Sequence, residues 1–249
     1  MLFSPFFCIV SDTSERLFET SSVRDDLFVP TAEAAFIAGI SDREMNRAVD
    51  EHILPGSLIR SDNGRRFARL AAALASFYFK TEDVYVSTLR RRVVLELTDR
   101  IRRRTGELEA ILTLHSDLLG DINWRIDVRP EAFDAVVSVD VGTFVFEAKR
   151  RVEEIDRAQE LITADPDVMG GLPVFAGTRV PIETVLASLN KGLDRKRLFE
   201  LYPALTDEHI EAAKVYMDVH PRRGRPSKAS RAPTSWKIKS SRRVSPRDS

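Results

Sequence analysis

The segment from Asp165 to His220 constrains the fold of this chain more than any other stretch. Turn-forming pairs stand at Asp165-Pro166 and Gly170-Gly171, and the apolar run 172–176 is long enough for one strand. Residues 177–179, Gly-Thr-Arg, then reverse the chain. The pattern predicts a strand that is followed by a compact helical unit.

Three short helices are expected after this turn. Pro181 suits the first position of a helix and Gly192 ends it, while Asp194 and Thr206 are caps for the second and third helices. The apolar residues that recur at helical spacing are Ile182, Val185, Leu186 and Leu189, then Leu198, Phe199 and Leu201, then Ile210, Ala213 and Met217. The turn 202–206 makes the last two helices a helix-turn-helix.

This segment resembles a bacterial family of small helix-turn-helix antitoxin domains, the VapB-like antitoxins, commonly encoded beside a PIN-type ribonuclease toxin. The resemblance covers residues 165–219, about a fifth of the chain. The matching positions are Gly171, Pro173, Gly177, Thr178, Arg179, Pro181, Gly192, Tyr202, Pro203, Leu205, Ala212 and Ala213. It implies a non-enzymatic protein that neutralises a PIN-type ribonuclease and represses its own operon.

A second helix-turn-helix is predicted near the N-terminus. Thr31 can begin a helix that Gly39 ends, and Ser41 with Glu44 forms a capping-box pattern for a helix to about His52. Short extended runs then flank the turn 61–64, whose Asn-Gly is a hairpin signal. This order resembles the winged helix of excisionases and mercury-resistance-type regulators.

Residue chemistry assigns reading of double-stranded operator DNA to this N-terminal unit. Arginine can bond guanine at two positions and asparagine can do the same with adenine, whereas wing arginines suit phosphates. The candidate base readers are Arg43, Asn46 and Arg47, and the wing arginines are Arg60, Arg65, Arg66 and Arg69. The C-terminal helix-turn-helix instead carries Asp207, Glu208 and Glu211, which phosphate repels, so a structural, dimer-forming or toxin-facing role is expected there.

Charge is divided unevenly along the chain. Residues 221–249 hold ten Lys/Arg and one acidic residue, whereas residues 1–220 hold 28 basic and 37 acidic residues. This basic, Pro- and Ser-rich tail is expected to be disordered. Arg222, Arg223 and Arg225 are the predicted toxin-binding residues, because the resemblance implies an arginine placed among the metal-binding carboxylates of the ribonuclease. Residues 222–226 also resemble an AT-hook core, which binds the minor groove.

The middle of the chain leaves an alternative open. Residues 122–149 alternate in the manner of strands, with a hairpin expected at 140–142 and a further strand at 143–146. Asp134, Glu147 and Lys149 then resemble the PD-(D/E)xK nuclease motif, in which carboxylates hold Mg²⁺ and lysine assists the attacking water. A DNA-binding regulator without a toxin is the other alternative.

These observations predict an α+β, predominantly helical protein, with a winged helix, a middle helix plus small β-sheet, and a C-terminal helix-turn-helix. The expected divisions are a leader at 1–28, a winged helix at 29–83, a middle segment at 84–162, an antitoxin-type unit at 163–220 and a tail at 221–249. A homodimer is expected, since DNA-binding proteins with two-fold symmetry match palindromic sites. No cofactor is expected. The single cysteine, Cys8, excludes an internal disulfide, and no apolar run suits a membrane, so a cytoplasmic protein is expected.

Overall fold

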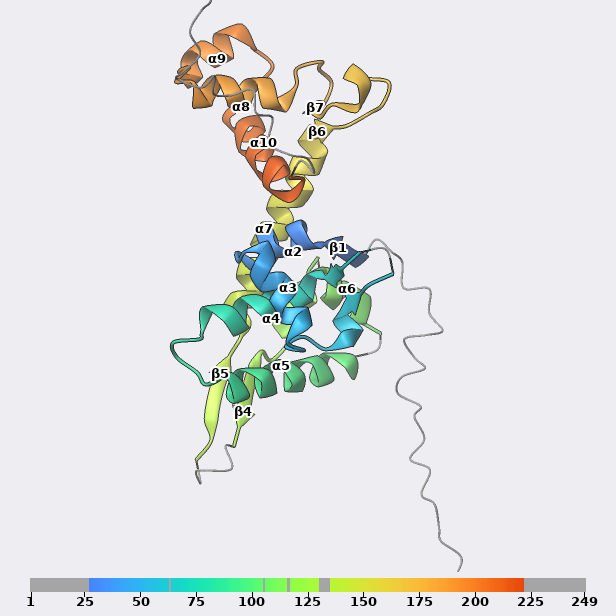
Figure 1. Cartoon of the computed structure of the whole chain (residues 1–249), viewed down its shortest axis with the longest axis vertical. Coiled ribbons are helices and arrows are strands. Elements are labelled where there is room, and N and C mark those ends of the chain that lie inside the picture. The colour runs from blue at the N-terminus through green and yellow to red at the C-terminus, as the bar shows by residue number, and fades with distance from the viewer. Residues whose placement is uncertain (1–26, 63, 105, 116, 130–134, 222–249) are drawn as a thin grey trace, which may run out of the picture.

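The computed structural model describes residues 27–62, 64–104, 106–115, 117–129 and 135–221. These residues form an α+β fold that is predominantly helical, as the sequence predicts, with three small antiparallel sheets. One long helix, α7 (Gly142–Leu161), runs from a larger N-terminal body to a smaller C-terminal module (Figure 1). Within the described ranges, no helix combines the length and apolar character needed to cross a bilayer.

The N-terminal body is built around α4 (Arg69–Lys80), whose residues 70–79 are all buried. A helix that is apolar on every side must lie inside a core. Around it lie β1 (Phe28–Pro30), α2 (Thr31–Ala38), α3 (Asp42–Asp50), the 3-10 turn η2 (Gly56–Leu58), β2 (Ile59–Arg60) and β3 (Arg66–Ala68). The sheet order is β1-β3-β2, so the predicted hairpin 59–68 is confirmed and gains a third strand.

The third strand, β1, begins at Phe28, a residue within the leader that the sequence predicts. Leu27 and Phe28 are buried in the N-terminal core, and Phe28 pairs with Ala68 of β3. A three-residue strand that ends in proline has no detectable period of its own. Its position is fixed by pairing with a segment about forty residues later, which the sequence pattern does not reveal.

The helix predicted from Ser87 is confirmed as α5 (Ser87–Arg102). Val93, Leu97 and Ile101 of the predicted stripe are buried and Leu89 is half-buried against the same core. The segment that sequence left ambiguous forms α6 (Leu108–Thr113) and the 3-10 turn η3 (Asp117–Asp121).

The predicted strand at 143–146 is wrong. The structure contains β4 (Arg125–Val128) and β5 (Val137–Asp140), and α7 then begins at Gly142 in place of a hairpin. Asp140 Oδ1 accepts a hydrogen bond from Gly142 N at 2.8 Å, which satisfies a donor at the start of the helix. Val145, Ala148, Val152 and Ile155 lie buried at helical spacing, and this longer period outweighs the strand-like composition of residues 143–146.

The C-terminal module contains a second hydrophobic core. The elements of this module are β6 (Ile162–Thr163), the 3-10 turn η4 (Met169–Gly171), β7 (Val174–Phe175), α8 (Ile182–Asn190), α9 (Arg195–Leu201) and α10 (Asp207–Val219). The predicted strand, its three helices and the Gly192 stop are therefore confirmed. Thr206 and His209 form a capping box at the start of α10.

Helix α10 returns along α7 toward the N-terminal body. Ile210 and Ala213 of α10 are buried in the second core, whereas Val219 near its end is buried in the first. The C-terminal helix α10 contacts α2, so the chain leaves α10 beside the N-terminal helix-turn-helix. The two modules are thus joined by two helices.

Candidate nucleic-acid interface

The turn between α2 and α3 contains a glycine in the left-handed conformation, which favours this residue. Gly39 has a φ of +62°, and its N–H donates to Phe36 O at 3.0 Å. A Cβ at this position would lie 2.5 Å from Nη1 of Arg151, whose guanidinium donates to Ile37 O at 3.1 Å. Arg151 of α7 therefore covers the C-terminal end of α2, where the helix carbonyls favour a cation.

A capping box fixes the start of α3. Ser41 Oγ accepts from Glu44 N at 3.2 Å, and Glu44 Oε2 accepts from Ser41 N at 2.8 Å. These bonds from Ser41, the backbone one first, lower the pKa of Glu44. Met45 and Ala48 bury one face of α3, which turns the opposite face toward solvent.

The three predicted base readers have different surroundings on α3. Arg43 is exposed. Arg47 is 46% exposed, pairs with Glu51 at 3.3 Å and stacks over the Phe79 ring at 4.7 Å. Asn46 Nδ2 donates to Asp42 O at 2.8 Å, and its Oδ1 accepts from Arg65 at 3.1 Å. Arg43 and Arg47 are thus exposed on α3, although Arg47 also contacts Glu51 and Phe79, whereas Asn46 is engaged inside the unit.

Arg65 joins the hairpin to α3. Its guanidinium lies 2.5 Å from Asp50 Oδ1 and also bonds Asn46. The contact joins the turn between β2 and β3 to α3. Two other wing arginines contact Phe28 of β1, since Arg60 stacks on its ring at 4.4 Å and Arg66 Nε donates to its carbonyl at 3.0 Å.

Arg69 does not belong to the wing, which corrects its predicted placement. It is the first residue of α4, its side chain is only 11% exposed, and it pairs with Glu33 at 3.2 Å and Asp156 at 3.4 Å. His115 lies 3.0 Å from the same guanidinium. Its partner Asp156 is 87 positions away, so local sequence could not show that Arg69 faces the interior.

Arg91 is a contributor that the sequence did not single out for this unit. Its Nη1 donates to Glu51 O at 2.7 Å and to His52 O at 3.2 Å, beyond the C-terminal end of α3. Arg90, in the same predicted triplet, is buried and stacks over Tyr78 at 4.3 Å. One arginine of the triplet therefore supports α3 and another supports the core.

The C-terminal helix-turn-helix has a different charge pattern. Arg195 of α9 bonds Asp207 and, at 3.0 Å, Glu211 of α10, and these hydrogen bonds raise the pKa of Arg195. Lys214, then Arg195, lowers the pKa of Glu211. Asp207, Glu208 and Glu211 of α10 are exposed and ion-paired, the second with Arg157 of α7 at 3.5 Å.

The nuclease alternative lacks its expected strand. Glu147 and Lys149 lie within α7, where residues two apart point to different sides of the helix. Glu147 pairs with Lys80 at 3.9 Å and Lys149 with Glu153 at 3.0 Å. Asp134 lies outside the described residues, as do Arg222, Arg223 and Arg225, and the described ranges hold no group of three or more potential metal ligands.

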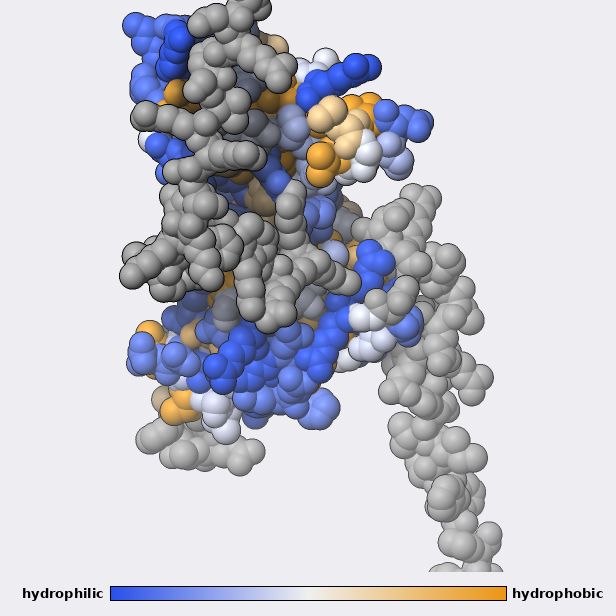
Figure 2. Space-filling model, turned by 45° about the horizontal axis from the view of Figure 1, so that its top comes forward, coloured by the Kyte–Doolittle hydropathy of each residue, from blue (hydrophilic) through white to orange (hydrophobic). Residues whose placement is uncertain are grey.

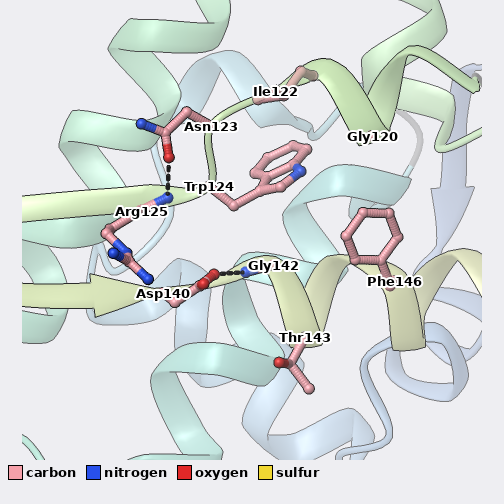
Figure 3. Close-up of a pocket in the computed structure, with 9 residues that line it drawn as sticks. All are labelled: Gly120, Ile122, Asn123, Trp124, Arg125, Asp140, Gly142, Thr143 and Phe146. Atoms are coloured by element: carbon pink, nitrogen blue, oxygen red, sulfur yellow. Dashed lines mark hydrogen bonds between the residues drawn. The ribbon is translucent and has the colours of Figure 1, made fainter.

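An open hollow of about 530 Å³ lies where β4 and β5 meet the start of α7 (Figure 3). Trp124, Arg125, Asp140 and Phe146 contribute to its lining. Asp140 is already bonded to Gly142 N, and its placement beside the helix start is structural. The interface described above therefore remains the strongest candidate site.

Comparison with known proteins gives the family. Residues 162–217 match the model described as "Protein of unknown function (DUF433)", which covers the C-terminal module. The uncharacterized protein y4eO of Sinorhizobium fredii (strain NBRC 101917 / NGR234) is 34% identical over 216 residues, 87% of this chain and 92% of that protein. No solved structure shows a significant match. The chain therefore belongs to the same family as y4eO and carries a DUF433 domain at residues 162–217.

Proposed function

We propose that this protein is an antitoxin that binds its own operator DNA through α2, α3 and the β2–β3 hairpin, and neutralises a PIN-type ribonuclease through its C-terminal part. The observation that carries the proposal is the capped α3, whose exposed arginines stand beside a hairpin braced by Arg65. The protein would act in the cytoplasm, where both partners are found, and would have no catalytic activity of its own.

The DNA-binding half rests on charge and exposure. Arg43 and Arg47 are exposed on α3, and their guanidinium groups would contact guanine edges or phosphates in a major groove, with Arg47 leaving its contacts with Glu51 and Phe79. Arg60 of β2 and Arg66 of β3 belong to the hairpin, and both lie in the three-stranded sheet that β1 completes. Because each phosphate contact releases counterions, binding should weaken steeply as salt concentration rises.

The toxin-binding half rests on the DUF433 match and on exposed apolar surface. The segment 165–219 is the part that resembles VapB-like antitoxins, and the DUF433 match covers nearly the same residues. Figure 2 shows an apolar area toward its upper right, and among the described residues of the C-terminal module Met169, Leu172 and Leu201 are exposed. Exposed apolar groups of this kind serve protein contacts. The tail arginines Arg222, Arg223 and Arg225 would then enter the acidic site of the ribonuclease.

A DNA-binding assay with the fragment upstream of the gene tests the first half. Arg43→Ala and Arg47→Ala should each weaken binding by about 1–3 kcal/mol if they contact base edges. Arg197→Ala is the matched control, because Arg197 is an exposed arginine of α9 that pairs with Glu200 at 2.7 Å. Equal loss in all three variants would show only a general charge effect and would contradict the assignment to α3.

Co-expression with the product of the neighbouring gene tests the second half. The proposal expects co-purification and inhibition of ribonuclease activity, and deletion of residues 222–249 should abolish inhibition. Absence of both complex and inhibition would leave a DNA-binding regulator without a toxin. Mg²⁺-dependent DNA cleavage by the purified chain that Glu147→Ala abolishes would instead support the nuclease and contradict the proposal.

A further inference from the structure

The sheet of β4 and β5 has two edges, and the chain itself covers one of them. Arg100 Nη1 of α5 donates to Asn123 O at 2.6 Å and to Arg125 O at 2.8 Å. Asn123 Oδ1 accepts from Arg125 N at 3.0 Å, as Figure 3 shows. Side chains therefore occupy the outer backbone groups at the start of β4, and this edge is closed to another strand.

By contrast, no other described strand pairs with the outer edge of β5. Val141 N donates to Trp124 O at 3.2 Å, so Trp124 and Val141 form a hydrogen-bonded pair of the β4–β5 sheet. Hydrogen-bonded pairs alternate with non-bonded pairs in antiparallel sheets, so Val139 faces Ile126 and the backbone of Ser138 and Asp140 points away from β4. Among the described residues, β5 has β4 as its strand partner. Its outward N–H and C=O groups can accept another strand.

We propose that β5 pairs antiparallel with β5 of a second copy of this chain, centred on Ser138, to form a continuous four-stranded sheet. In this register Ser138 faces Ser138 across a two-fold axis, and Asp140 faces Val136. Val136 is 54% exposed in the single chain, so pairing gives this apolar side chain a neighbour. The same register sets Val137 against Val139 on the other face of the sheet.

Carboxylate repulsion and the number of hydrogen-bonded pairs favour the register centred on Ser138 over the registers centred on Val139 and Asp140. A register centred on Asp140 would place two carboxylates directly opposite each other, which is unfavourable. One centred on Val139 would form two hydrogen-bonded pairs from residues 136–140 in place of three. Two isolated strands are marginal in water, whereas four strands make a more stable sheet, so the pairing also stabilises β4 and β5.

We assign the partner as a second copy because the outward N–H and C=O groups of residues 136–140 can pair antiparallel with the same groups of an identical strand. The pairing stands on backbone geometry alone and does not depend on DNA or toxin binding. It would relate two α2–α3 units by a two-fold axis, as readers of palindromic sites are related. Failure of the DNA assay would therefore leave this inference intact, and failure of this inference would leave the proposed DNA binding without a dimer formed through β5.

Site-specific crosslinking tests the register. Ser138→Cys in a Cys8→Ser background should form a covalent dimer on copper-catalysed oxidation, since the Cα atoms of directly opposed bonded residues lie about 5.5 Å apart, within disulfide reach. Asp127→Cys is the control, because Asp127 pairs with Ser138 inside one copy. Two such residues would be three strand spacings apart, about 14 Å. Absence of a Ser138 crosslink, or equal crosslinking of both variants, would overturn the proposal.

Light scattering on the purified full chain supplies a second test. Ser138→Pro removes the central amide donor and should halve the molar mass, while Ser138→Ala keeps the amide and should leave a dimer. Circular dichroism identifies a proline variant that is unfolded, and the crosslinking result then decides. A folded Ser138→Pro variant that remains dimeric, or a wild-type chain that is monomeric at tens of micromolar, would contradict pairing through β5.

Discussion

Arg69 connects three parts of the fold through one buried guanidinium. It pairs with Glu33 of α2 and Asp156 of α7, and His115 Nε2 lies 2.6 Å from Asp156 Oδ2 in the same cluster. Burial raises the pKa of Glu33 more strongly than Arg69 lowers it. The cluster therefore depends more on its cation than on the Glu33 charge.

Replacing the cation should cost more than neutralising the carboxyl. Arg69→Met should lower the free energy of unfolding by about 3 kcal/mol at pH 7, because it leaves the buried carboxyl of Glu33 without its cation. Glu33→Gln should cost clearly less, as it removes a charge that burial disfavours. Urea unfolding of both variants checks the order, and equal losses would contradict it.

The pKa direction of Glu33 also fixes a pH dependence. Since its folded pKa is raised above 4.5, its stabilising contribution is full below that pH and is lost as pH rises through the folded pKa. Glu33→Gln should remove this part of the dependence. Unfolding midpoints measured in steps upward from pH 4 would show the difference between the two proteins.

Ser41 provides a second test at the residue scale. Ser41→Ala removes the cap of α3 and should destabilise the protein by about 1 kcal/mol. Because Ser41 lowers the pKa of Glu44, the associated stability is present above pH 4.5 and is lost as pH falls through the folded pKa. Ser188→Ala in α8, whose hydroxyl only bonds Thr184 O, is the control and should be near neutral.

At the scale of elements, Arg65 determines how the hairpin is held against α3. Arg65→Ala removes its bonds to Asn46 and Asp50 and should speed amide exchange in β2 and β3. The loss of stability should stay within about 1 kcal/mol, since the side chain is 36% exposed. Hydrogen exchange with Arg197→Ala as control measures the effect. Unchanged exchange in the hairpin would show that β1 alone orients it.

Elements with caps, a long period or a marked turn could be predicted from sequence, whereas very short strands without such a signal could not. Gly39, the Ser41 box and Gly192 mark the ends of α2, α3 and α8 as expected. The strands β1 and β6 have three and two residues, so tertiary pairing alone defines them. The start of α7 was misread because Thr143, Phe144 and Val145 favour strands locally.

In the candidate site, the exposed arginines could be predicted from sequence, whereas the contacts of other residues could not. Arg43 and Arg47 are exposed on a helix whose register the capping box and Met45 reveal in sequence. The burial of Arg69 and the engagement of Asn46 by Arg65 arise from contacts between separate elements. Such contacts have no signature in a single stretch of residues.

At the scale of the whole molecule, α7 and α10 make the two cores depend on each other. Val215 packs against both cores and Val219 is buried in the first. Val219→Ala should therefore destabilise the protein by about 2 kcal/mol and lower the protection of α8 and α4 together. Leu201→Ala, at a site 54% exposed, is the control. Two separate unfolding steps in the wild-type chain would contradict this dependence.

The return of α10 along α7 also decides where the tail is tethered. Residue 221 follows His220 beside α2, at the waist of the molecule, and not at the far tip of the C-terminal module. A chain of 28 residues reaches at most about 95 Å from such an anchor. The ten basic residues of 222–249 are therefore joined to the fold between the two modules and not at the tip of either.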